Sequence, residues 1–109
     1  MAQDFERHID RNTGTSPVTV HTSDSDDALI GIRLANVHAS SSINVDVYIT
    51  NGGSDYYIIK TAPIPVGGSL DLIDGGAKIV IQSGDALKIV SDTASSLDSI
   101  VSRIDTISS

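Results

Sequence analysis

The sequence contains no cysteine and no tryptophan, and its aromatic residues are limited to three tyrosines and one phenylalanine. Without cysteine, neither disulfides nor thiolate metal sites can form, and the redox compartment cannot be inferred. Because aromatic side chains are so few, Ile, Val and Leu must fill the core, and the β-branched ones pack well on a pleated sheet. These absences favour an all-β protein with an aliphatic core.

Basic residues are also scarce. Seven Lys and Arg stand against 14 Asp and Glu, which gives a formal net charge of −7 and a pI near 4.5. This charge repels phosphate backbones and anionic lipids, so we expect neither a nucleic-acid partner nor a membrane partner. No stretch approaches the ~20 apolar residues of a membrane span, and the first residues lack the apolar core of a signal peptide. We therefore expect a soluble chain.

The clearest positive signal lies in residues 43–62, where apolar and polar residues alternate with the period of two of a half-buried strand. The apolar positions of this run are Ile43, Val45, Val47 and Ile49. Gly52 and Gly53 follow, which adopt positive φ in tight turns, and a second β-rich run begins at Tyr56. The pattern predicts a β-hairpin with Val47 facing the core and Asp46 facing solvent.

Further short strands are predicted on both sides of this hairpin. Their apolar positions are Val18 and Val20; Ile30, Ile32 and Leu34; Leu70 and Leu72; Ile79 and Ile81; and Leu87 and Ile89. In residues 28–38 the second face carries Gly31, Arg33 and Ala35, so this face is either solvated or in close contact with a partner. Strands at this spacing predict a jelly-roll-like antiparallel β-sandwich of seven or eight strands over residues 17–109.

Two segments are predicted to lie outside the regular sheets. Residues 1–16 are polar, and although Phe5 and Ile9 have helical spacing, Gly14 would soon end a helix, so we expect a flexible N-terminal arm. Pro63 and the proline two residues later remove two ladder donors, which predicts a crossing that joins strands without pairing.

The C-terminal segment fits two structures. Its apolar residues Leu97, Ile100, Val101, Ile104 and Ile107 would share one face of a helix. The segment is also rich in serine and β-branched residues, which favours a closing strand over residues 101–107. We prefer the strand, because a lone helix would leave a sheet edge unpaired.

No pattern of acidic, histidine or serine residues predicts an active site. The acidic turn residues are Asp24, Asp26, Asp27, Asp71, Asp74 and Asp85, and the histidines are His8, His21 and His38. The acidic turns lack the Gly and Glu of an EF-hand loop, and no spacing places two imidazoles on one metal. The G-x-S-x-G nucleophile elbow is also missing. We therefore predict no catalytic, cofactor or metal residue and no enzymatic activity, and calcium binding by the turn aspartates stays open.

Exposed aromatic side chains are the best candidates for contacts with other proteins. Tyr48 falls on the polar face of its strand, and Tyr56 and Tyr57 must point to opposite faces, so at least one ring should lie outside the core. Large rings of this kind serve as interface anchors. The candidate interface residues are Tyr48, Tyr56, Tyr57, Phe5 and Arg33.

The second half of the chain carries two longer motifs. They are D-Y-Y-I-I-K-T-A-P-I-P-V-G-G-S-L and K-I-V-I-Q-S-G-D-A-L-K-I-V-S-D-T-A-S-S-L-D-S-I-V-S. Over residues 28–107 the chain thereby resembles small virion structural proteins of tailed bacteriophages. The resemblance implies a β-sandwich built into a virion as a head decoration, neck or tail component, made in the host cytoplasm. It implies partners that are copies of the chain and other virion proteins, and it brings no catalytic residue and no cofactor.

A second class of function is compatible with the same residues. A ligand-binding β-sandwich module could use exposed tyrosines and turn aspartates to contact a carbohydrate or a receptor. A homo-oligomer that binds no glycan favours the structural role, whereas a monomer that binds a glycan favours the ligand-binding role.

Overall fold

The computed structural model describes residues 4–73 and 78–105, which form nine β-strands and no helix. The strands are β1 (Asp4–Thr13), β2 (Val18–Thr22), β3 (Asp27–Asn36), β4 (Ile43–Asn51), β5 (Ser54–Ile64), β6 (Ser69–Asp71), β7 (Ile79–Ile81), β8 (Ala86–Ser91) and β9 (Leu97–Asp105). The all-β prediction is confirmed, with more strands than the seven or eight expected.

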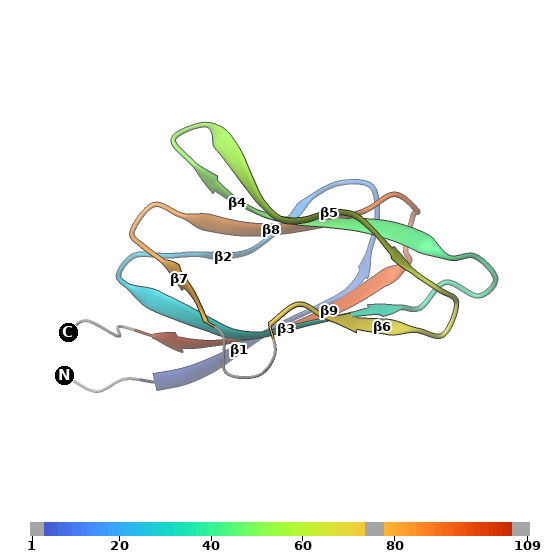
Figure 1. Ribbon diagram of the computed structural model, residues 1–109, viewed down its shortest axis with the longest axis horizontal. Helices are drawn as coiled ribbons and strands as arrows, with labels where there is room; N and C mark the ends of the chain where they lie inside the picture. Colours follow the sequence, from blue (N-terminus) through green and yellow to red (C-terminus); the bar gives the residue numbers. More distant parts are fainter. Residues whose placement is uncertain (1–3, 74–77, 106–109) are drawn as a thin grey trace.

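The strands form two stacked antiparallel sheets (Figure 1). Sheet A has the order β1-β9-β3-β6, with β7 also paired to β3, and sheet B has the order β2-β8-β4-β5. The pairs β4 with β5, β3 with β6 and β7, β2 with β8, and β1 with β9 nest around a single central turn. The chain is therefore one long hairpin rolled into two sheets, which is a jelly roll.

The core lies between the sheets and is aliphatic, as the composition predicts. Its buried members are Leu29, Ile32, Leu34, Ile43, Val45, Val47, Ala62, Ile64, Ile73, Ile81, Leu87, Ile89, Leu97 and Val101. Strands β3, β4, β5, β7, β8 and β9 each supply at least one of them, and Ile73 follows β6. This core is the main source of stability, at about 25 cal/mol per Å² of apolar surface removed from water.

The predicted central hairpin is confirmed in β4 and β5. Gly52 and Gly53 form its two-residue turn with φ values of 59° and 83°, the positive range that the turns matching strand twist require. Val45 and Val47 point into the core with 1% and 0% of their surface exposed. The rolled hairpin is thus centred on the turn with the strongest sequence signal.

The flexible N-terminal arm is a wrong prediction for residues 4–13. These residues form β1, which pairs along its length with β9 at the edge of sheet A. Its side chains alternate, so Phe5 and Ile9 are exposed on the outer face while Glu6 and His8 point inward. The inward residues are polar because they meet a buried arginine, Arg103, instead of the aliphatic core.

Two details of the predicted strands also differ. In β3 a register shift between Leu29 and Gly31 turns Leu29 into the core, so Leu29 is fully buried and Ile30 only half-buried. Strand β5 runs through Pro63, which pairs with Asn44. Strand β5 is the edge strand of sheet B, so no neighbouring strand lies on its free side to accept an N–H from Pro63. The proline therefore costs the sheet no ladder hydrogen bond on that side.

The C-terminal segment is a strand, as preferred. Strand β9 lies between β1 and β3 in sheet A and pairs with both, so its backbone supplies hydrogen-bond partners to the edges of two strands. Residue 107 of the predicted strand and Asp74 of the acidic turns lie outside the described residues.

Candidate functional site

Four of the five candidate interface residues lie on the two opposite outer faces of the sandwich, and Tyr56 points the other way from Tyr57. Tyr48 and Tyr57 are paired on the outer face of sheet B, with ring centroids 5.0 Å apart. Lys60 Nζ lies 4.3 Å from the Tyr57 ring centroid, a cation–π contact. This stacking leaves Tyr48 only 7% exposed, whereas Tyr56, on the other face of β5, is 60% exposed. Tyr48 therefore contributes little free surface.

The outer face of sheet A carries the other two candidates. Phe5 on β1 is 76% exposed, the most exposed large apolar residue in the described chain. Arg33 on β3 is also exposed and forms an ion pair with Asp71 on β6, with Nε 3.0 Å from Oδ1. The structure therefore separates Phe5 and Arg33 from Tyr48 and Tyr57 by the thickness of the sandwich.

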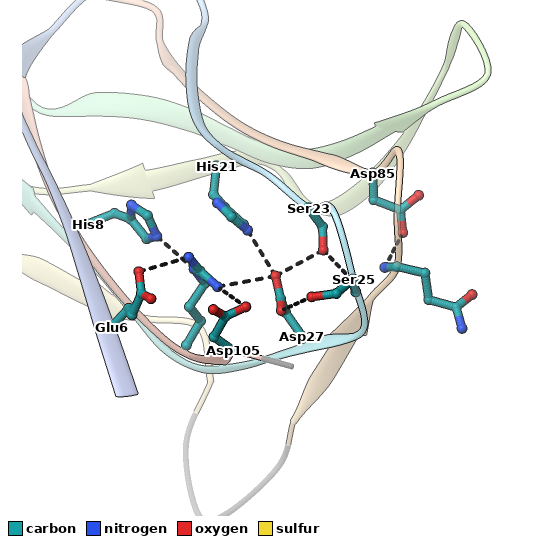
Figure 2. Close-up of polar contacts among 10 residues, drawn as sticks. Glu6, His8, His21, Ser23, Ser25, Asp27, Asp85 and Asp105 are labelled. Atoms are coloured by element: carbon teal, nitrogen blue, oxygen red, sulfur yellow. Dashed lines mark hydrogen bonds and ion pairs between the residues drawn. The ribbon is translucent and has the colours of Figure 1, made fainter. Parts of the chain in front are cut away.

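A buried polar cluster that the sequence analysis did not predict joins β1, β2, β3 and β9 (Figure 2). Its centre is Arg103, which donates hydrogen bonds from Nε to His8 at 2.8 Å, from a terminal nitrogen to Glu6 at 2.9 Å, and from the other to Asp27 at 3.2 Å. Asp105 lies 3.1 Å from the same nitrogen that contacts Asp27. Because the Arg103 side chain is 7% exposed and Asp27 is 0% exposed, the charges are compensated inside the protein.

The two histidines of this cluster stack, with ring centroids 5.0 Å apart and planes inclined by 28°. Arginine is always a donor, so Nε2 of His8 accepts and the ring is neutral. Burial, followed by the nearby His21 and Arg103, lowers the pKa of His8 from its usual value. His21 Nε2 in turn lies 2.9 Å from Asp27 Oδ2.

The cluster contains serine, histidine and aspartate but not in the arrangement of a hydrolytic triad. The Ser23 hydroxyl lies 2.6 Å from the Ser25 carbonyl oxygen and 2.9 Å from the Asp27 carboxylate, so it donates to one of these acceptors at a time. The His21 ring binds the same carboxylate and not the hydroxyl. A general base bonded to the nucleophile is what activates a serine, and this geometry does not provide it.

Two shallow hollows lie on the surface. One, of about 240 Å³, is on sheet B and is lined by Asn44, Asp46, Thr61, Val90, Ser91 and Asp92. Asp46 accepts a hydrogen bond from the Thr61 N–H at 2.7 Å, and Asp92 accepts one from the Asn44 N–H at 3.0 Å. The Asn44 bond is the main cause of a lowered pKa of Asp92.

The other hollow, of about 290 Å³, lies between β1 and β9 and is lined by Ile9, Asp10, Arg11, Asp98, Ser99 and Ile100. We call it the Ile9–Ile100 hollow. It adjoins the point where β1 shifts register and Asn12 has a φ of 55°. Asp98 accepts the Asn12 N–H at 2.9 Å and so holds the irregular backbone in place.

The turn aspartates do not gather around one point. Asp27 is buried against Arg103 and His21, Asp71 pairs with Arg33, and Asp85 accepts the Gln82 N–H. Within residues 4–73 and 78–105, no three His, Cys, Asp or Glu side chains are placed to hold a metal ion. In the same residues, no helix has the length and apolar character needed to cross a bilayer.

Comparison with protein-family models and with curated proteins finds no match to this chain.

Proposed function

We propose that this chain is a non-enzymatic structural protein of a bacteriophage virion, in which it works by packing against copies of itself and against other virion proteins. The resemblance of residues 28–107 to such proteins motivates the proposal. The rolled-hairpin sandwich supports it, because a jelly roll is a rigid block whose outer faces are free to bind neighbours.

The observation that carries the proposal is the contrast between the surface and the interior. Large apolar side chains are exposed on the surface, including Phe5 at 76%, Tyr56 at 60% and Ile9 at 59%. The centre of the polar cluster, Arg103 and Asp27, is buried, and its charges are paired with one another and with the partly exposed Glu6 and Asp105. Exposed aromatic and aliphatic anchors favour protein contacts.

The test is incorporation into a particle. Phage particles that lack the chain are incubated with the purified protein and sedimented, and the bound protein is quantified in the pellet. We expect saturable binding with a fixed number of copies per particle. A protein that stays in the supernatant at every concentration contradicts the proposal.

A ligand-binding module is the second candidate, and the hollow on sheet B favours it. Asp46 and Asp92 carry carboxylate oxygens there that sugar hydroxyls can bind, and Tyr48 follows Asp46 on the same face of β4. A glycan array with wild-type protein and an Asp92→Asn variant tests this role. Specific binding that Asp92→Asn removes, together with no particle binding, puts the ligand-binding role first.

A further inference from the structure

We propose that the outer face of sheet A binds a second copy of the chain, with Phe5 of each copy seated in the Ile9–Ile100 hollow of the other. The proposal deepens the proposed function and rests on it in one respect, namely that the chain acts by assembling with copies of itself. It names the surface and the partner of one such contact.

Strand pairing places apolar and small side chains side by side across this face. The pairs that point outward are Phe5 with Ile104, Ile104 with Ala28, Ala28 with Val80, Ile9 with Ile100, and Gly31 with Ser102. Val80 is 55% exposed and Ile100 is 45% exposed. Gly31 and Ser102 are small and lie between the two apolar rows, so another surface can approach closely above them, and the exposed Arg7 completes this middle row beside Ser102.

The face contains both a projecting ring and a hollow that can receive it. Phe5 projects with three quarters of its surface in solvent, and the hollow has apolar walls at Ile9 and Ile100 beside the charged Asp10, Arg11 and Asp98. The hollow has a volume of about 290 Å³. An apolar cavity of ~150 Å³ holds a benzene ring, so the hollow is large enough for a phenylalanine side chain.

The positions of the ring and the hollow suit a two-fold dimer. Phe5 and Ile9 lie four residues apart on the same face of β1, which is ~14 Å along the strand. A two-fold axis that lies in the interface parallel to the sheet, at right angles to β1 and midway between the two residues, places each Phe5 over the partner's hollow. Contacts in a symmetric dimer are reciprocal in this way, so one ring and one hollow per chain form two equivalent contacts.

Charge also favours this face for contact between identical chains. Each copy carries a net charge of −7, so contact through an acidic surface is opposed by repulsion. On the outer face of sheet A the acidic group of Asp71 is paired with Arg33, and Asp98 accepts a backbone N–H. Arg11 is exposed on β1 and brings positive charge toward the partner's acidic chain, whereas Arg7, midway between Phe5 and Ile9, lies near the axis opposite the same residue of the second copy. Repulsion between two copies is therefore weaker here than at the acidic turns.

The face is also large enough. The ten residues of β1 and four strands ~4.8 Å apart give a flat area on the order of 600 Å², to which side-chain relief adds. A stable interface buries ~800 Å² per partner, so a contact over most of this face meets the requirement. On the outer face of sheet B, Tyr48 is 7% exposed and Tyr57, which stacks on it and contacts Lys60, is 44% exposed, so neither ring is as exposed as Phe5.

The first test measures the mass of the full chain by sedimentation equilibrium over micromolar to millimolar concentrations. Wild type should dimerise, and Phe5→Asp and Ile100→Asp should each weaken the dimer at least ~10-fold, since each places a carboxylate in an apolar contact. Tyr56→Asp, a change of an exposed ring on the other sheet, should leave the dimer intact. Circular dichroism confirms that each variant is folded.

The second test uses the lack of native cysteine to map the contact. Phe5 pairs with Ile104, so within one copy Phe5 and Ile100 are ~14 Å apart along the strand, too far for a disulfide. An equimolar mixture of Phe5→Cys and Ile100→Cys proteins should form a linked dimer on mild oxidation. Phe5→Cys mixed with Tyr56→Cys should link far less.

The outcomes separate this inference from the proposed function. A monomeric wild type overturns the dimer, and so does a dimer that Phe5→Asp and Ile100→Asp leave unchanged or that forms no Phe5–Ile100 link. Sedimentation with phage particles is independent of these results. A chain that binds particles but fails here keeps its structural role and loses this interface.

Discussion

Arg103 is the residue on which the polar end of the sandwich depends. It contacts Glu6, His8 and Asp27, which lie on β1 and β3, while it belongs to β9 between them. A buried ion pair is weak evidence for net stabilisation, because desolvation offsets the attraction. Loss of Arg103 is costly all the same, because the Asp27 carboxylate then stays buried without its arginine, with His21 and Ser23 as neighbours.

We predict that Arg103→Met lowers the free energy of unfolding by about 3–5 kcal/mol, because Asp27 remains fully buried without its cation. The matched control is Arg33→Met, which removes an exposed ion pair on the same sheet and should cost ~1 kcal/mol or less. Urea unfolding of both variants measures the difference. Equal losses would mean that the cluster around Arg103 is solvated in the native protein.

A second residue pair tests the direction of the β4 side chains. Val47→Asp should prevent folding at room temperature, because Val47 is 0% exposed and a buried carboxylate there costs more than ~4 kcal/mol. Asp46→Ala should fold and lose ~1 kcal/mol, because it gives up only the hydrogen bond from the Thr61 N–H. Circular dichroism and thermal melting measure both. If Val47→Asp is as stable as Asp46→Ala, the inward face of β4 is assigned wrongly.

For single residues, the sequence predicts burial well where apolar and polar residues alternate regularly along a strand, and poorly where a register shift interrupts that alternation. Val45 and Val47 are buried as expected. Leu29 takes the core position that the pattern assigned to Ile30, because a register shift moves the inward face by one residue. Tyr48 lies on the outer face as predicted, yet it is buried by Tyr57, a cross-strand contact that depends on the hairpin register.

At the scale of strands, β1 shows what periodicity alone leaves undecided. Its outward residues Phe5 and Ile9 are apolar and its inward residues Glu6 and His8 are polar, the reverse of the usual pattern. The polar residues point inward because they bind the buried Arg103, which lies about a hundred residues later in the chain. A sequence pattern contains no sign of such a distant partner, so this strand resembled a loose arm and the cluster was not predicted.

His8 makes the attachment of β1 sensitive to pH. Its pKa is lowered in the folded protein by burial first and then by His21 and Arg103, so the unfolded chain binds a proton more readily than the folded chain. Above the usual pKa of ~6.5 the residue is neutral in both states and has no effect. As pH falls below that value, the unfolded state is protonated first and stability falls until the folded pKa is passed.

We therefore predict that the melting temperature falls between neutral pH and about pH 5 and that His8→Gln reduces this fall. Glutamine offers an oxygen that can accept the Arg103 N–H but does not titrate in this range. Val66→Gln, at an exposed site outside the cluster that carries no ionisable group, is the control and should keep the wild-type dependence. An unchanged slope in His8→Gln would exclude His8 as the titrating group.

The central turn can be tested at the same scale. Gly53 has a φ of 83°, so Gly53→Ala should cost ~1 kcal/mol and loosen the hairpin around which the other strand pairs nest. Gly31→Ala is the control, because its new Cβ would lie 3.9 Å from Ser102 in ordinary contact and should be neutral or slightly stabilising. Guanidinium unfolding of dilute samples measures both. A neutral Gly53→Ala contradicts the requirement for positive φ.

For the whole molecule, the fold class follows from composition and strand spacing, and the strand order follows from the hairpin. Once the turn at Gly52 and Gly53 is recognised, each earlier strand pairs with a later one, and rolling brings the outermost pair to the edge. The surface is less predictable. Phe5 and Arg33 come to share one face only because β9 separates their strands, and the Ile9–Ile100 hollow arises from an irregular pairing.

The net charge of −7 leads to the last prediction, which concerns assembly in salt. Two acidic copies repel one another over a Debye length of ~10 Å at 0.1 M salt, and the length falls to ~3 Å at 1 M. If the apolar face of sheet A joins them, added salt screens the repulsion while the apolar contact remains. The dimer dissociation constant should therefore fall several-fold as NaCl is raised from about 0.05 to 0.5 M.

A variant separates screening from a general effect of salt on apolar contacts. Asp24→Asn combined with Asp55→Asn changes the formal charge by two, from −7 to −5, at exposed sites away from the outer face of sheet A. It should dimerise more tightly at low salt and respond less to added NaCl, because less repulsion remains to be screened. A dimer that weakens with salt in both proteins indicates an interface held by opposite charges, and Phe5 in its hollow could not then be the main contact.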